Sequence, residues 1–227
     1  MYTFRPTAFT YVPYDANTRG FPTEYEPDCC TGVTGVQWDP EVFQKDWPPP
    51  HLDMNVTIHQ TWQAMVECVE AGLVKSIGVC NVKVSLLHEL LKGTDYVPQI
   101  VQCESHPYCQ QSGLIQMCEQ NGIQFQAYSP LGYGEFKSDD EVSVLENPVV
   151  QKIASKHGKS TAQVVLRWHI QRGVPTPPFS LHENEMRQNL TVGSWALEDS
   201  DMEAMKSIDK DFHYLRPESW YGLPLWS

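Results

Sequence analysis

The sequence predicts a parallel α/β fold, and the alternation of its predicted strands and helices supports this. Between residues 54 and 215, short apolar runs alternate with helical patterns of roughly 10 to 15 residues, as in parallel sheets with helices packed outside. No GxGxxG fingerprint follows a predicted strand, which argues against a Rossmann dinucleotide site. Right-handed crossovers then leave two architectures open, a barrel segment or an open doubly wound sheet.

Glycines mark the ends of the first predicted elements. Residues 57–71 carry apolar side chains at helical spacing, and Gly72 follows them. Residues 75–81 form a short apolar run that indicates a buried strand. Residues 85–91 return to a helical spacing, and Gly93 is expected to end that helix. The regular region therefore opens with a helix, a strand and a second helix.

The next predicted elements are a strand, a helix and another strand. The first strand covers 99–103. Ser112 is expected to cap the helix, because a serine hydroxyl can accept a hydrogen bond from the first helical turn. Asn121 and Gly122 predict its C-terminal end. The second strand covers 123–128.

Two later helices have explicit start signals. Asn147 followed by Pro148 is typical of a helix N-terminus, and we expect this helix to end at Gly158. Ser160 and Gln163 match the capping box of the next helix. The remaining predicted elements are a strand over 174–180 and short helices over 183–190 and 199–208.

Prolines give the predicted strand over 174–180 a special character. Pro175, Pro177 and Pro178 fall inside it, and each removes one backbone donor. A central strand does not tolerate such losses, whereas an edge strand does. We therefore expect this strand to form an edge that resists unwanted pairing.

Composition limits the functional classes. The net charge of −12 and the isoelectric point near 5.0 argue against a nucleic-acid binder, which would be expected to present a basic patch. No apolar run reaches the length of about 18 residues that a membrane span needs. The opening residues show neither the basic nor the apolar region of a signal peptide. We expect a soluble protein of a reducing intracellular compartment, either cytoplasm or organelle interior.

The seven cysteines are irregularly spaced, and no pair of CxxC motifs occurs. This spacing predicts no zinc site, so no metal ligand is assigned. Cys68 and Cys118 lie in apolar helical patterns, where buried thiols are expected. The adjacent Cys29 and Cys30 lie in a loop-like region, and a redox role for them is a separate hypothesis.

Four segments carry a resemblance to a known family: GLVKSIGVCN (72–81), QCESHPY (102–108), AYSPLG (127–132) and the stretch 160–173. Their order and spacing are similar to those of the aldo-keto reductases, a family of NADPH-dependent carbonyl-reducing enzymes. Within this family, the sequence resembles xylose-reductase-like members. The resemblance implies a partial (β/α)8 TIM barrel made of roughly units four or five to eight. Ligand groups in such barrels lie at the C-terminal ends of the strands.

The resemblance also implies a nicotinamide site, which we expect to be vestigial or weak. In the family, a pair after the fifth strand and a glutamine on the sixth bind the carboxamide. A tyrosine on the seventh stacks on the nicotinamide ring, and a serine and a leucine follow near the pyrophosphate. Each functional role has a structural alternative. For example, the tyrosine is a core aromatic residue, or the asparagine caps the following helix. The corresponding residues are Cys80, Asn81, Gln102, Tyr128, Ser129 and Leu131.

The adenosine-phosphate end departs from the family pattern. Family members hold the phosphate with a lysine–serine pair on the eighth strand and an arginine soon after. Here the lysine position is Phe179, followed by Ser180, and the arginine position is Glu185. Gln188 and Asn189 match adenine-contact positions. Because charge-assisted hydrogen bonds contribute about 1.5–3 kcal/mol, we expect weak NADPH binding.

No catalytic residue is assigned in this chain. The family's tyrosine acid, its lysine and its aspartate come from units one to three, and we find no counterpart for them. A histidine after the fourth strand orients the substrate in the family, and residues 1–13 resemble that point with Phe4 in its place. A phenyl ring cannot donate a hydrogen bond. His106 lies in a segment with a structural role in the family, so it is not proposed as a base.

These observations favour a non-catalytic, pseudoenzyme-like subunit of a larger protein assembly, with no cofactor expected and no turnover of aldehydes. The alternative is an NADPH-dependent aldo-keto reductase whose catalytic half is missing from this sequence or supplied by another chain.

Three segments are predicted: a Pro/Gly/aromatic-rich N-terminal segment (1–53), the half barrel (54–211) and an aromatic C-terminal tail (212–227). A half barrel exposes apolar surface that something must cover. We expect contacts with other protein subunits, and none with nucleic acid, through the Trp38–Trp47 loop and through Phe212, Tyr214, Trp220, Tyr221 and Trp226.

Overall fold

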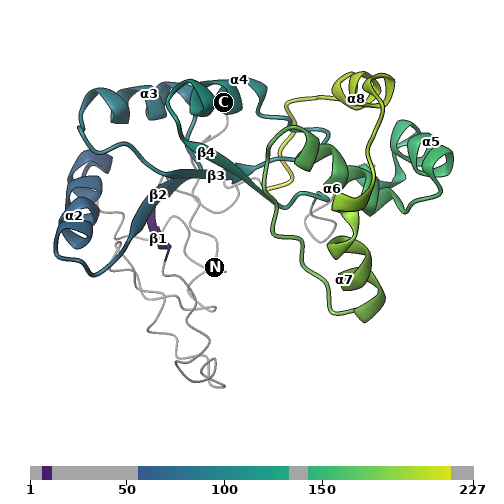
Figure 1. Ribbon diagram of the computed structural model, residues 1–227. Helices are drawn as coiled ribbons and strands as arrows, with labels where there is room; N and C mark the ends of the chain where they lie inside the picture. The colour runs from purple at the N-terminus through teal and green to yellow at the C-terminus, as the bar shows by residue number, and fades with distance from the viewer. Residues whose placement is uncertain (1–6, 12–55, 133–142, 216–227) are drawn as a thin grey trace, which may run out of the picture. The chain divides into compact units, whose positions relative to one another are not determined.

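The computed structural model describes residues 56–132 and 143–215, together with a short strand over 7–11 (Figure 1). The chain divides into two compact units, one formed by residues 1–99 and 216–227 and the other by residues 100–215. Most of the predicted 1–53 segment lies outside the described residues. So do several residues singled out in the sequence: Phe4, Cys29, Cys30, the Trp38–Trp47 loop, Trp220, Tyr221 and Trp226.

The first unit contains a two-stranded antiparallel ladder. Strand β1 (Thr7–Tyr11) pairs with β2 (Ser76–Cys80), with Thr7 opposite Cys80 and Tyr11 opposite Ser76. An antiparallel partner for β2 was not anticipated, because residues 7–11 lie in a segment without a clear strand pattern. The pairing satisfies backbone groups on one edge of β2 that would otherwise be exposed.

Helices α2 (Ile58–Glu70) and α3 (Val84–Lys92) complete the described part of this unit. Thr57 begins α2 with a capping box that includes Gln60. Trp62 is buried and donates a hydrogen bond from Nε1 to the Tyr96 carbonyl at 2.9 Å, which ties α2 to the loop after α3. Gly93 ends α3 as predicted.

In the second unit, β3 (Ile100–Glu104) and β4 (Gln124–Tyr128) pair in parallel with Ile100 opposite Gln124. Helix α4 (Ser112–Gln120) forms the crossover and packs against β4. The prediction that Ser112 caps this helix is wrong. Gln111 precedes the helix in a left-handed conformation with φ 54° and makes no side-chain cap bond.

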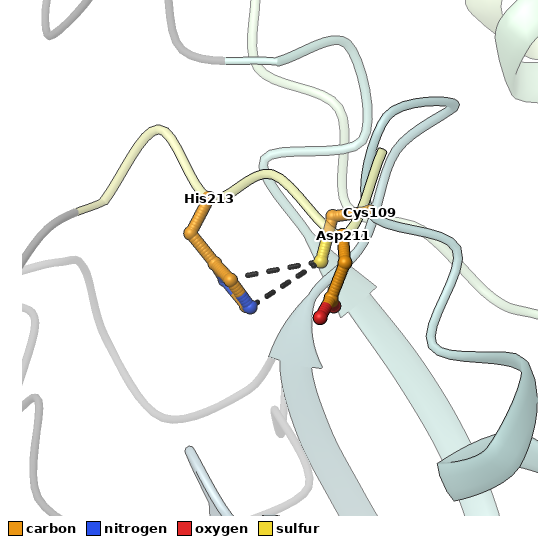
Figure 2. A group of neighbouring side chains, drawn as sticks. All are labelled: Cys109, Asp211 and His213. Atoms are coloured by element: carbon orange, nitrogen blue, oxygen red, sulfur yellow. Dashed lines mark hydrogen bonds between the residues drawn. The ribbon is translucent and has the colours of Figure 1, made fainter. Parts of the chain in front are cut away.

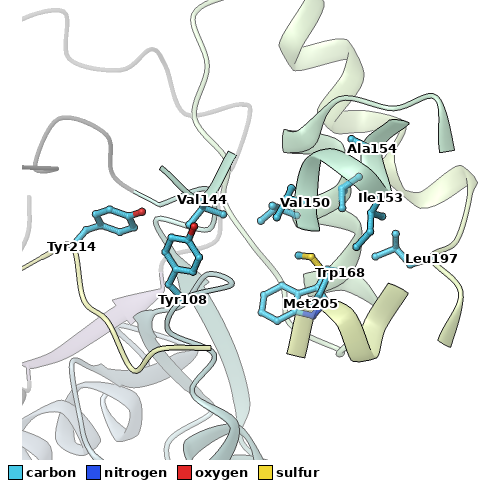
Figure 3. Packing of buried hydrophobic residues seen from close by; sticks show 11 residues of the cluster. Tyr108, Val144, Val150, Ile153, Ala154, Trp168, Leu197, Met205 and Tyr214 are labelled. Atoms are coloured by element: carbon cyan, nitrogen blue, oxygen red, sulfur yellow. The ribbon is translucent and has the colours of Figure 1, made fainter. Parts of the chain in front are cut away.

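A helical group follows the two strands of this unit and holds a cluster of buried apolar side chains. Its helices α5 (Pro148–His157) and α6 (Thr161–Gln171) pack together. Figure 3 shows Trp168 close to Met205, with aliphatic side chains of α5 nearby. The other elements are the 3₁₀ turns η3 (Val144–Glu146) and η4 (Val192–Ser194) and the helices α7 (Glu183–Leu190) and α8 (Asp199–Lys206).

The strand predicted over 174–180 is not formed. Val174 is buried and the Ala127 N–H donates to the Pro175 carbonyl at 3.0 Å, so the segment begins beside β4. Pro175, Pro177 and Pro178 cannot donate the bonds that a ladder would need. The prolines therefore exclude a regular strand here.

No helix in the described ranges combines the length and the apolar character that crossing a bilayer requires.

The capping box of α6 leads to a stability prediction. Ser160 Oγ accepts from the Gln163 N–H at 3.3 Å, and the Gln163 side chain accepts from the Ser160 N–H at 3.1 Å. Ser160→Ala should lower the free energy of unfolding by about 1 kcal/mol or more, because it removes the N-cap bond and the bond from Ser160 Oγ to Gln188 Oε1. Ser155→Ala, on the exposed face of α5, is the control and should change it by less than about 0.5 kcal/mol. Equal effects in urea unfolding would contradict a capping role.

Candidate functional site

One face of the β3–β4 pair is lined by polar side chains. Parallel pairing places Gln102 opposite Gln126 and Glu104 opposite Tyr128. Because side chains alternate along a strand, these four share a face, while Val101, Cys103, Phe125 and Ala127 lie on the other. The Gln102 amide donates to Gln126 Oε1 at 2.6 Å. The face therefore carries two adjacent amides, with an aromatic ring at the end of the second strand.

A tight turn follows Tyr128, which is itself buried. Ser129 has φ 48°, and the Gly132 N–H donates to the Ser129 carbonyl at 2.9 Å. A side chain at Gly132 would meet the Tyr214 ring at 2.8 Å, so only glycine fits this approach. Leu131 packs partly buried against the core. Ser129 Oγ is buried and has no hydrogen-bond partner among the described residues.

The residues expected at the phosphate end form contacts with one another. Ser180 Oγ donates to Glu185 Oε2 at 2.6 Å, and Phe179 is 80% exposed. Gln188 accepts from Ser160 Oγ at 3.1 Å, which fastens α7 to the start of α6. Asn189 is half-buried at the end of α7. A carboxylate therefore occupies the neighbourhood where the family places a cation.

The other expected carboxamide residues belong to the first unit. Asn81 follows β2 in a left-handed conformation with φ 55° and is buried, and its Nδ2 lies 3.8 Å from Cys80 Sγ. Lys83 is the N-cap of α3 and makes no side-chain cap bond. The structural alternative for Asn81, a cap of this helix, is therefore not realised.

Glu104 is a fully buried carboxylate that collects donors from distant parts of the second unit. Oε1 lies 3.1 Å from His106 Nε2 and accepts from the Tyr214 N–H at 2.9 Å. Oε2 lies 2.9 Å from His213 Nδ1. Burial alone raises the pKa of Glu104, but hydrogen bonds and charge from the two histidines outweigh it and lower the pKa to about 2. His106 is thus engaged in an internal bond, in keeping with a structural role.

Two aromatic residues of the predicted C-terminal tail belong to this unit. Tyr214 is 3% exposed within the apolar core, and Phe212 packs against the same core. Their rings meet edge to face at 5.1 Å between centroids. Tyr214 is thus buried within its own unit and Phe212 is half-buried, and the expected contacts of the tail with other subunits stay a prediction.

Sequence reasoning missed Gln126 and Glu104. The alternation QFQAY over 124–128 marks Gln126 as a neighbour of Tyr128 on one face, so that signal was present. Glu104 gave none, because its partners His213 and Tyr214 lie 109 and 110 positions away in the sequence.

Comparison with known proteins shows the family to which this chain belongs. Residues 37–210 match the family model described as the aldo/keto reductase family. The chain is 37% identical to an NAD(P)H-dependent D-xylose reductase of Pyricularia oryzae, covering 73% of this chain and 53% of that protein. It is 35% identical to an NADP-dependent D-sorbitol-6-phosphate dehydrogenase of Malus domestica, covering 78% and 57%.

A solved structure agrees with these matches. The chain superposes on an aldo/keto reductase from Brucella melitensis with a TM-score of 0.59 and 36% identity, over 66% of this chain and 54% of that one. The chain spans about half the length of the curated relatives it matches.

Proposed function

Because this chain belongs to the aldo/keto reductase family, we propose that it forms the nicotinamide-binding side of an NAD(P)H-dependent carbonyl reductase. Its fold is the α/β fold of that family, in agreement with a partial TIM barrel. The names of the relatives include NAD(P)H-dependent and NADP-dependent enzymes, which supports this function over the expected non-catalytic subunit. The expectation that no cofactor binds has no support in these comparisons.

The observation that carries the proposal is the shared face of Gln102, Gln126 and Tyr128. Two adjacent amides offer a donor and an acceptor that match the carboxamide of nicotinamide, and the tyrosine ring offers a stacking surface. Ser129 Oγ, buried without a partner among the described residues, fits a ligand oxygen beyond the ring. These residues bind and orient the cofactor.

A reduced nicotinamide, when bound, supplies a hydride to a carbonyl carbon. By the family resemblance, the tyrosine acid and its lysine and aspartate belong to barrel units one to three, which have no match in this sequence. We propose that they come from residues outside this sequence or from another chain. The substrate's position is then set partly by groups that the described residues do not include.

The Ser180–Glu185 contact suggests which nucleotide is bound. The carboxylate of Glu185 repels the additional phosphate of NADPH, and Arg187 is already paired with Glu183 at 2.7 Å. NADH carries no such phosphate. The proposed cofactor is therefore NADH, or both nucleotides without preference for NADPH.

Charge reversal at Glu185 tests this proposal. Fluorescence titration of the full 227-residue chain should show NADH binding at least as tight as NADPH binding. Glu185→Lys should tighten NADPH binding by about tenfold or more, since one charge-assisted hydrogen bond contributes about 1.5–3 kcal/mol. NADH binding should change little. Gln102→Ala should weaken both nucleotides by about tenfold, because both share the nicotinamide.

Two matched variants control for indirect effects. Glu203→Lys adds the same charge to the exposed face of α8, and Gln116→Ala removes an exposed amide from α4. If Glu203→Lys improved NADPH binding as much as Glu185→Lys, the specific phosphate contact would be refuted. Failure of the unaltered chain to bind either nucleotide would refute the proposed function itself.

A further inference from the structure

Three side chains with different donor atoms meet beyond the end of β3 in the second unit (Figure 2). Cys109 comes from the loop after β3, and Asp211 and His213 come from the segment after α8. One ligand atom from each lies within 4.8 Å of the other two. The group thus joins parts of the chain that are about a hundred positions apart, as the separation of 104 between Cys109 and His213 shows.

The spacing of the cysteine and the histidine suits a tetrahedral cation. Cys109 Sγ lies 3.5 Å from His213 Nε2. Zinc bonds of about 2.3 Å to sulfur and 2.0 Å to nitrogen place those two atoms roughly 3.5 Å apart in a tetrahedral site. Sγ also lies 3.8 Å from His213 Nδ1, so the sulfur lies beside the ring, and the ring must turn for Nε2 to point at an ion shared with Cys109.

A second carboxylate orients the histidine. His213 Nδ1 lies 2.9 Å from Glu104 Oε2, so this nitrogen donates to the carboxylate, and Nε2 is the ring nitrogen that would bind an ion. Histidines that bind metals characteristically donate their other ring nitrogen to such a group. Since Glu104 is fully buried and held by several donors, its carboxylate is in place as the partner of Nδ1 before any ion arrives.

The third ligand has an unusual backbone. Asp211 has φ 51°, a left-handed conformation that non-glycine residues seldom adopt, and its N–H donates to Asp209 Oδ1 at 3.3 Å. Such conformations persist where the surroundings impose them, and they gather at ligand sites. Three carboxylates, of Glu104, Asp209 and Asp211, also make the surroundings negative, which favours a cation.

A nucleophilic thiol fits this group less well than a metal ligand does. Cys109, His213 and Glu104 form a thiol–imidazole–carboxylate series like that of an activated cysteine nucleophile. However, Cys109 is 1% exposed and lies near carboxylates, which oppose formation of a thiolate in the absence of a metal. The cluster of His157, Glu198 and Asp201 is a weaker cation site. It already holds the Lys156 ammonium, at 2.7 Å from Glu198 and 2.9 Å from Asp201, and is thus neutralised within the chain.

We propose that Cys109, Asp211 and His213 bind a divalent cation of the zinc type. Three protein ligands leave a fourth position for water, and binding releases the Cys109 proton to solvent. The ion would fasten the segment over 211–213 to the loop after β3. None of the three ligands belongs to the Gln102, Gln126 and Tyr128 set, although Glu104 shares a strand face with that set. The test of the metal site does not depend on cofactor binding.

Zinc and cobalt binding to the full chain tests the proposal. Competition with a chromophoric chelator should give one Zn²⁺ per chain with a Kd below about 1 μM. Co²⁺ should produce the sulfur-to-cobalt charge-transfer absorption of a thiolate ligand. Zn²⁺ should raise the melting temperature, because a ligand that binds only the folded state stabilises it. Cys109→Ser and His213→Gln should each weaken zinc binding about a hundredfold or more.

Control variants separate this site from the remaining thiols and histidines. Cys118→Ser removes another buried thiol, Cys29→Ser with Cys30→Ser removes the adjacent pair, and His157→Gln disrupts the cluster around Lys156. All three should keep the zinc affinity, and circular dichroism should confirm that every variant is folded. Unchanged binding in folded Cys109→Ser, a Co²⁺ spectrum without the charge-transfer band, or loss of binding in any control would overturn the proposal.

Discussion

Trp168→Ala is expected to lower the free energy of unfolding by about 3–5 kcal/mol, the range for truncating a large buried aromatic side chain. Trp168 is 1% exposed and lies in the core cluster with Met205 and side chains of α5. Its ring also faces the Arg172 guanidinium, with 4.2 Å between Cζ and the ring centroid. Truncation therefore opens a cavity and removes a cation–π contact from a poorly solvated charge.

The state of Arg172 indicates that the effect should lie in the upper part of this range. Burial lowers the pKa of Arg172 to about 10, and Nη2 donates to the Gln110 carbonyl at 2.6 Å. Nη1 has no hydrogen-bond partner among the described residues. The indole face thus provides a large part of this guanidinium's surroundings.

Urea unfolding followed by circular dichroism would measure the change. Phe179→Ala is the matched control, because Phe179 is an aromatic residue of the same unit that is 80% exposed. It should alter stability by less than about 0.5 kcal/mol. A loss below about 1.5 kcal/mol for Trp168→Ala would show that the surrounding helices close over the cavity.

Glu104→Gln is expected to cost about 3–5 kcal/mol, because it removes one partner from a buried set of charge-assisted bonds. An amide cannot accept from His106, His213 and the Tyr214 N–H together, since one of its two polar atoms is a donor. Glu183→Gln is the control. Its ion pair with Arg187 is exposed and should contribute no more than about 1 kcal/mol.

The same carboxylate predicts an acid-sensitive stability. Its pKa is about 2 in the folded chain against an ordinary value of 4.5. A lowered folded pKa means that the stabilisation is complete above about pH 4.5 and is lost as the pH falls towards 2. The shift corresponds to on the order of 3 kcal/mol. We expect the difference in free energy of unfolding between the unaltered chain and Glu104→Gln to become smaller as the pH falls through this range. A difference that stays constant with pH would contradict the role of ionisation.

Local signals predicted much of the fold. Ser160 with Gln163, Asn147 with Pro148, and Gly158 define helix ends through bonds within a few residues, and all were confirmed. The predicted strand over 174–180 was wrong, because the prediction gave too little weight to the backbone donors that its three prolines lack. Strand β1 was missed since its partner β2 lies some seventy positions along the chain, as the pairing of Thr7 with Cys80 shows.

The candidate site shows the same contrast between residues that sequence signals predicted and contacts that form between distant parts of the chain. Gln102 and Tyr128 were placed by family resemblance, and their common face follows from strand alternation. Glu185 was assigned by the same resemblance to the family's arginine position, and its bond to Ser180 could be seen only in the structure. The Cys109, Asp211 and His213 group could not be predicted, because its members share no local motif and the cysteine spacing indicated no metal.

The Glu104 carboxylate also bears on how the second unit folds. Its bonds to His213, Tyr214 and Leu215 close loops of 109, 110 and 111 positions. Contacts of such sequence separation carry a large loop-closure entropy and slow the search for the native state. The local helices α5 and α6 can form before this closure, whereas the carboxylate stays hydrated until the 213–215 segment arrives. The closure is therefore a late folding event, and removing it with Glu104→Gln should speed unfolding more than it slows folding in stopped-flow kinetics.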